Sequence, residues 1–88
     1  MPVSNDDWTL DDESELQVLI PWLAAEPGSE IKNRVMVWIV ELVQNPVGRG
    51  VEERPGVFTA TVPDAERVVI WTLDLEKKLV VLLHIGPA

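Results

Sequence analysis

The sequence predicts an α+β domain in which two helices come first and a sheet of three strands follows, with a short N-terminal strand beside it. Apolar residues recur at helical spacing only in the first half of the chain, whereas alternating and β-branched segments fill the second half. The chain has 88 residues, which is enough for one domain with a modest core. Short turns separate the predicted strands, so the sheet should be an antiparallel meander.

The N-terminal region predicts a tail followed by the folded domain. Residues 1–7 are polar and acidic, and we expect a flexible acidic tail there. A single domain is then expected over residues 8–88. Its first element is a short β-prone stretch at residues 8–10, which indicates an edge strand.

A first helix is predicted over residues 15–25. Ser14 and Gln17 lie three positions apart and fit a capping box at its start. Pro21 opposes a helix, because a proline in a helix interior removes a hydrogen bond and kinks the axis. The alternative is a strand over residues 16–20, followed by a short helix that begins at the proline. We favour the kinked helix.

The second helix is predicted over residues 30–44, where its length and a cap at Ser29 outweigh the many β-branched residues. Asn45-Pro46 should end it, since the residue before a proline resists the helical conformation. The face opposite its main apolar stripe is also apolar, at Val37, Val40 and Val43. A helix of this kind is either buried on two sides or keeps one side for a partner.

The second half of the chain predicts three strands. Residues 47–56, with their glycines and a proline, are expected to be a loop. Residues 57–62, 67–73 and 79–85 have strand patterns, and turn residues separate them. The last of these strands is apolar on both sides and should therefore lie inside the sheet.

Charge and composition exclude several classes of function. The net charge is −8, and residues 1–44 contain nine acidic and only two basic residues. Nucleic-acid binding should therefore be weak or absent, whereas the acidic half is either a plain soluble surface or faces a basic protein partner. The chain has no cysteine and one histidine, so we expect no metal and no cofactor. The apolar runs are too short to span a membrane, and we expect a cytoplasmic protein.

Few side chains are candidates for chemistry. Arg49, Arg54 and Arg67 are the candidates for phosphate or RNA binding. Arg67 is in phase with Trp71, so the two could hold a phosphate and stack a base, or form a cation–π pair on the surface. His84 is either a lone acid–base residue or a half-buried strand histidine. The candidates for binding a partner protein are Trp22, Val37, Val40 and Trp71.

Several segments together resemble the RelE/ParE toxin superfamily. They are the helix end Val43-Gln44-Asn45-Pro46, the strand start Gly56-Val57-Phe58, and the two strand regions at residues 66–74 and 76–86. The resemblance implies a twisted antiparallel sheet with two helices packed on it and an extra N-terminal strand. It also implies an antitoxin-like protein as a partner, and we count a homodimer among the expected assemblies.

In the ribonuclease members of this superfamily, basic residues on the sheet hold messenger RNA in the ribosome, and this chain departs from their pattern. Thr59 and Thr61 stand where lysines or arginines are frequent, and His84 stands where an arginine is frequent. Arg67 is one residue out of register with the position expected for an arginine, which falls on Val68. Only Arg67 and His84 therefore remain as catalytic candidates.

These departures predict a toxin-like component that acts through protein binding and carries a degenerate ribonuclease site. One alternative is a ribosome-dependent messenger RNA endoribonuclease with a reduced site. The other is an unrelated small acidic interaction domain that shares only the strand pattern.

Overall fold

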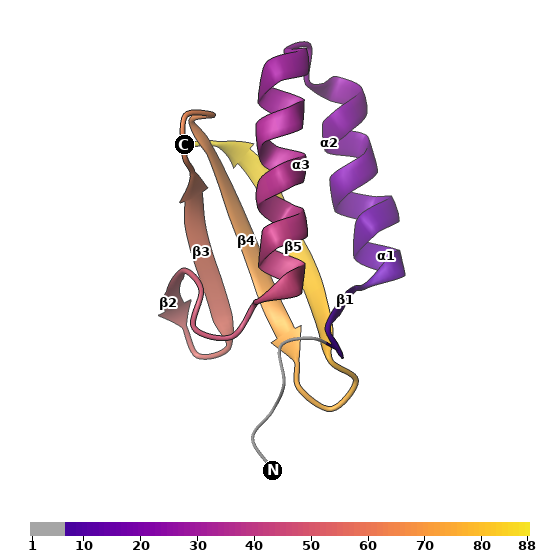
Figure 1. The fold of residues 1–88 in the computed structure, drawn as a ribbon, viewed down its shortest axis with the longest axis vertical. Coiled ribbons are helices and arrows are strands. Elements are labelled where there is room, and N and C mark those ends of the chain that lie inside the picture. The colour runs from indigo at the N-terminus through magenta and orange to yellow at the C-terminus, as the bar shows by residue number, and fades with distance from the viewer. Residues whose placement is uncertain (1–6) are drawn as a thin grey trace.

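Two antiparallel helical segments lie side by side on one face of a five-stranded sheet (Figure 1). The computed structural model describes residues 7–88, so the predicted tail, apart from its last residue, lies outside the described residues. The strand order is β1-β5-β4-β3-β2. All neighbouring strands are antiparallel except β1 and β5, which run parallel. The predicted α+β class is thus confirmed, although the sheet is mixed and has one strand more than expected.

The first helical segment is one continuous run made of α1 (Asp12–Ser14), a π-helical turn (η2, Glu15–Leu19) and α2 (Ile20–Ala25). The strand alternative for residues 16–20 is therefore wrong. The wide π turn ends just before Pro21, and the Ile20 N–H donates to the carbonyl of Glu15. A proline has no N–H to donate and its ring crowds the carbonyl four residues earlier, so a wider turn accommodates it.

The helix also begins earlier than the capping-box reading predicts. Asp11 is the cap, and its Oδ2 accepts a hydrogen bond from the Ser14 N–H at 2.9 Å. Ser14 is buried inside the first turn, where its hydroxyl donates to the Asp11 carbonyl at 3.0 Å. Gln17 bonds the side chain of Glu13 at 3.3 Å instead of closing a capping box. An aspartate caps a helix as well as a serine does, so the sequence is compatible with a helix start at either Asp11 or Ser14.

The second helix, α3, spans Ser29–Gln44, close to the predicted range. Its cap position is Gly28, and no side chain caps it, so the predicted role of Ser29 is wrong by one residue. Asn45 leaves the helical conformation immediately before Pro46, as predicted. The side of α3 that faces the sheet is fully buried at Val35, Ile39 and Leu42.

The sheet contains the three predicted strands and two short ones. β3 (Val57–Val62), β4 (Arg67–Asp74) and β5 (Leu79–Pro87) form the predicted meander. β1 (Thr9–Leu10) pairs with the start of β5. β2 (Val51–Arg54) lies inside the predicted loop, and this strand was not expected.

The β2–β3 hairpin explains why that strand is hidden in the sequence. Pro55 and Gly56 form its turn, and Gly56 has a φ of +78°, which suits the third position of a type II turn. All four residues of β2 are exposed. Because neither side of the strand is buried, its sequence does not need to alternate between apolar and polar residues.

The core lies between α3 and the sheet, with Trp71 of β4 at its centre. Its side chain has no exposed area. Phe58 stacks on it with ring centroids 6.1 Å apart, and Trp38 of α3 meets it edge-on at 5.6 Å. Trp71 therefore cannot contact a partner, and its prediction as a partner-binding residue is wrong. Strand alternation turns it inward, toward the helices.

None of the helices in the described part of the chain is long and apolar enough to cross a membrane.

Candidate functional site

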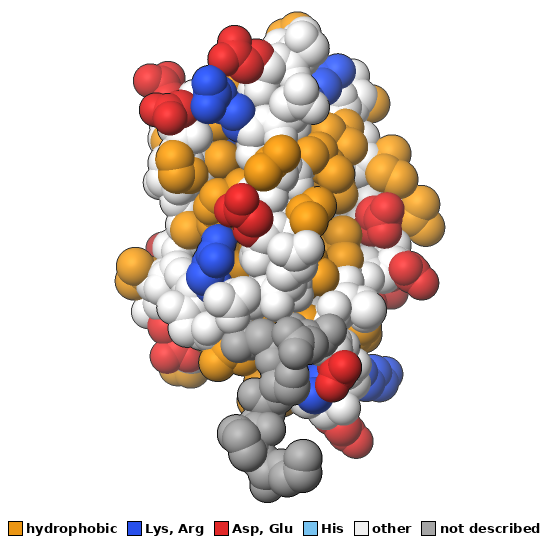
Figure 2. Space-filling model, in the orientation of Figure 1, with side chains coloured by type: hydrophobic (Ala, Val, Ile, Leu, Met, Phe, Trp, Pro, Cys, Tyr) orange, Lys and Arg blue, Asp and Glu red, His pale blue; other side chains and the backbone are white. Residues whose placement is uncertain are grey.

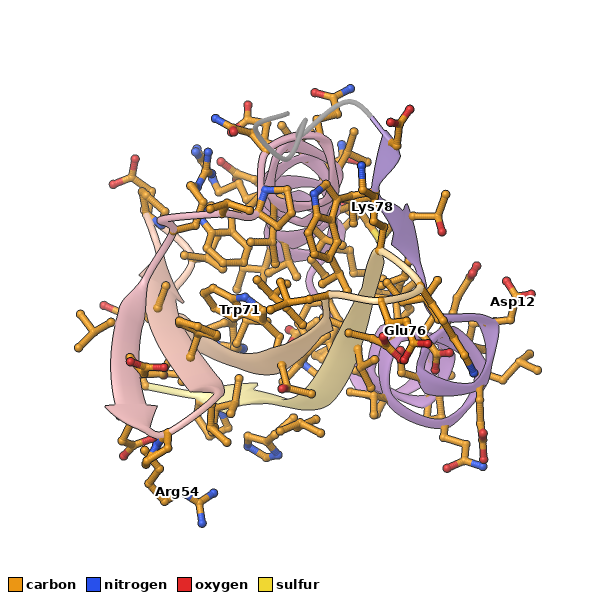
Figure 3. The ribbon with its side chains drawn as sticks, turned by 90° about the horizontal axis from the view of Figure 1, so that it is seen from below. Asp12, Arg54, Trp71, Glu76 and Lys78 are labelled. Atoms are coloured by element: carbon orange, nitrogen blue, oxygen red, sulfur yellow. The ribbon has the colours of Figure 1, made fainter. Side chains whose placement is uncertain are left out.

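The face of the sheet that points away from the helices is the candidate site. Figure 3 shows both helical segments on one side of the sheet and, among residues 7–88, no element on the other side. Val69 and Trp71 of β4 are buried beneath the helices, so alternation turns their neighbours in the strand to the opposite side. We call this surface the open face, and it is formed by apolar and hydroxyl side chains together with one imidazole: Val57, Thr59, Thr61, Val68, Ile70, Thr72, Val81, Leu83 and His84.

A β-bulge in β5 shapes the centre of the open face. Ile70 pairs with His84 and Trp71 pairs with Leu82, so Leu83 is the extra residue. The extra residue changes the phase of the strand, which lets both Leu82 and Ile85 point into the core. Leu83, which is 45% exposed, and His84 consequently both lie on the open face.

No carboxylate in residues 7–88 orients His84 for catalysis. Its ring lies over Gly86, where a Cβ would collide with Nε2. Within the described residues, no hydrogen bond or ion pair joins the imidazole to a carboxylate. A histidine that serves as a general base is usually held by a third group. The imidazole is exposed on the strand, so the alternative prediction of a half-buried histidine is wrong as well.

Arg67 lies on the helix side of the sheet, away from His84. Its guanidinium donates to Glu26 Oε2 through Nε at 3.2 Å and through Nη2 at 2.9 Å. Nη1 donates to the carbonyl oxygens of Ala65 and Glu66 at 3.2 and 3.1 Å. The hydrogen bond from Arg67 holds the pKa of the Glu26 carboxyl below its ordinary value, although desolvation opposes this. Arg67 therefore joins the start of β4 to the C-terminal end of α2, and four of its five N–H donors are already used.

The other two arginines do not join Arg67. Arg54 projects from the sheet on the side away from both helices (Figure 3) and is exposed. It pairs with Val57 at one end of β3, whereas Arg67 pairs with Val62 at the other end. Arg49 is half-buried in the loop between α3 and β2. The three candidate arginines are therefore not brought together, and Arg54 alone lies at the border of the open face.

Thr59 and Thr61 both lie on the open face. Thr61 is exposed and Thr59 is half-buried, and they pair with Val68 and Ile70. The open face is a mostly apolar, nearly uncharged surface.

In residues 7–88, no group of three or more histidine, aspartate or glutamate side chains is placed to hold a metal ion.

Comparison with known proteins identifies the fold. No family model matches the sequence, and no curated protein matches it closely enough to count as a relative. The structure is similar to the crystal structure of the isolated E. coli RelE toxin, with a TM-score of 0.70 and 20% sequence identity. The match covers 92% of this chain and 84% of that one. The chain therefore has a RelE-like fold.

Proposed function

We propose that this chain is a toxin-like component that acts by binding a protein, and that its ribonuclease site is degenerate. The observation that carries the proposal is the open face, which presents Thr59, Thr61 and Val68 where the resemblance leads us to expect basic residues. We expect an antitoxin-like protein as a partner and the cytoplasm as the site of action. A homodimer stays a prediction, which sedimentation of the purified protein would test.

Electrostatics supports protein binding over RNA cleavage. A nuclease that works in the ribosome must approach phosphate, and this chain carries a net charge of −8. Among the described residues, the open face and its border offer only His84 and Arg54 as basic side chains, whereas such chemistry uses several cationic groups. Each lost donor that stabilises developing charge typically costs about 3–4 kcal/mol of the activation barrier. The remaining groups are too few for efficient cleavage.

The apolar character of the open face supports a protein as the target. A sheet with apolar side chains on both faces is normally covered on both. Here the helices cover one face, and Ile70, Val81 and Leu83 on the other remain accessible to a partner. Uncovered apolar patches of this kind mark protein interaction sites on soluble domains.

The direct test is expression in a translating extract, followed by mapping of messenger RNA ends. We expect no cuts beyond those of an extract without the protein, with a ribonuclease member of the superfamily as the positive control. Cuts at fixed codon positions would instead support the reduced-site endoribonuclease. Because Arg67 is tied to Glu26, the variant that tests such cuts is His84→Ala with Arg54→Ala, which leaves that ion pair intact.

The protein target is tested by growth inhibition in bacteria. We expect expression of the chain to slow growth without RNA cuts, and Leu83→Glu to abolish the effect by placing a charge in the open face. The matched control is Leu75→Glu, because Leu75 is 69% exposed in the β4–β5 turn, outside the open face. If both variants stay inhibitory, the open face is not the surface that acts.

A further inference from the structure

A second apolar surface lies on the opposite side of the molecule, over the helices. Val37 and Val40 of α3 are 58% and 49% exposed, on the side of the helix away from the sheet. Figure 2 shows hydrophobic side chains gathered along the front of the molecule, over α3 and beside it. We call this surface the helical ridge and define it by Val37 and Val40.

The ridge has a groove on each side. Between α3 and the first helical segment, Leu19, Met36 and Val43 line an apolar groove of about 240 Å³, with Glu15 at its edge. Between α3 and the end of β3, Val37 and Trp38 line a wider groove of about 520 Å³, with Glu41 at its edge. An apolar ridge between two grooves is the shape into which another helix packs, ridges into grooves.

The charge around the ridge is negative and largely unneutralised. Glu15 and Glu41 lie on opposite sides of Val40, and within residues 7–88 neither takes part in an ion pair. Arg34 also lines the wider groove, but it is already paired with Glu30 at 2.8 Å and with Asp64 at 3.9 Å. The sequence up to residue 44 has nine acidic and two basic residues, a net of −7, so the field at this surface attracts cations.

We propose that the helical ridge binds an amphipathic helix of a protein partner whose apolar stripe is flanked on both sides by lysine or arginine. A helix is the fitting occupant because the backbone groups of α3 are satisfied within α3, which leaves no strand edge at this surface. The inference rests on the proposed function in that it assumes protein binding, and it assigns the chemistry of one partner. It concerns a surface separate from the open face.

The test is a selection of random peptides of about 20 residues, roughly 30 Å as a helix, against the full chain. We expect enriched peptides with apolar residues at helical spacing and lysine or arginine beside them. A synthetic copy of the best peptide should gain helical circular dichroism on binding. Its affinity should fall about tenfold or more for Val40→Lys, and also for Glu15→Lys with Glu41→Lys.

The matched control is Val51→Lys, since Val51 is 69% exposed on β2 and belongs to neither helix. It should leave the affinity unchanged, and thermal unfolding should show that all variants are folded. Failure to enrich any peptide, enrichment of acidic peptides, or equal losses for Val40→Lys and Val51→Lys would each overturn the proposal. If it fails while the translating extract shows no RNA cuts, protein binding through the open face still stands.

Discussion

The two faces of the sheet differ in what covers them, although the same strands build both. In β4, Val69 and Trp71 are fully buried under α3, whereas Ile70 and Thr72 lie half-exposed on the open face. One face therefore stabilises the fold, and the other is free to change without loss of the core. The comparison teaches that substitutions on the open face can change its chemistry while the core under the helices is kept.

The largest effect should come from the covered face. Trp71→Ala removes a fully buried aromatic that contacts Phe58 and Trp38, so it should lower the free energy of unfolding by about 3–5 kcal/mol. Ile70→Ala, one residue along on the open face, should cost less than about 2 kcal/mol. Urea unfolding measures both. Equal losses would mean that the open face is packed as tightly as the core, contrary to the comparison.

A smaller effect is expected at Gly50, which lies against the covered face. Its φ is +72°, and a Cβ there would run into the ring of Trp71 and the carbonyl oxygen of Thr59. Gly50→Ala should therefore cost about 2–3 kcal/mol, from backbone strain and the displaced tryptophan together.

Gly56→Ala is the control for backbone strain alone. Gly56 also has a positive φ, of +78°, but a Cβ there would meet open space. The expected cost is about 1 kcal/mol. If Gly50→Ala lowers the free energy of unfolding no more than Gly56→Ala does, the added methyl group at residue 50 does not disturb Trp71.

The elements that the sequence predicts well are those with a strong local pattern. α3 and the meander follow from apolar spacing and short turns, and both are at the expected residues. β2 was missed because a four-residue exposed edge strand has no buried side to set an alternation. The Pro55-Gly56 turn was the available signal, since it brings the preceding residues back along β3.

The site was harder to predict for two reasons. It depends on which face of the sheet each side chain points to, and on hydrogen bonds between residues far apart in the sequence. The bulge at Leu83 shifts the phase of β5, and a period-two reading places residues after such a bulge on the wrong face. Arg67 bonds Glu26, 41 positions earlier, which no local pattern indicates. Trp71 was counted as a partner-binding residue because sequence alone gives alternation without saying which side the helices cover.

The ion pair between Arg67 and Glu26 should make the stability of the protein depend measurably on pH. Arg67 lowers the pKa of Glu26 in the folded protein below its ordinary value of 4.5. The stabilisation is therefore present above the unfolded-state pKa and is lost as the pH falls through the lower folded-state pKa. Urea midpoints between about pH 5 and pH 3 should fall less steeply for Glu26→Gln than for the unmodified protein. Glu30→Gln is the control, because the Glu30 side chain is 78% exposed in its pair with Arg34 and should change the slope little.

The smallest effect on stability is expected from Thr59→Lys with Thr61→Lys. This double variant also tests most directly how the open face differs from the covered face. Both threonines lie on the open face, so the double variant should unfold at nearly the same urea concentration as the parent. It changes the net charge from −8 by two units, to −6, and places both new charges on one strand. Binding to single-stranded RNA should then appear, with a plot of log affinity against log salt steeper by about 1.4, because each phosphate contact contributes about 0.7. Cleavage should stay absent, since the substitutions give His84 no carboxylate that would orient its imidazole. If the unmodified chain already binds RNA with the same salt dependence, the open face is not the neutral surface on which the proposed function depends.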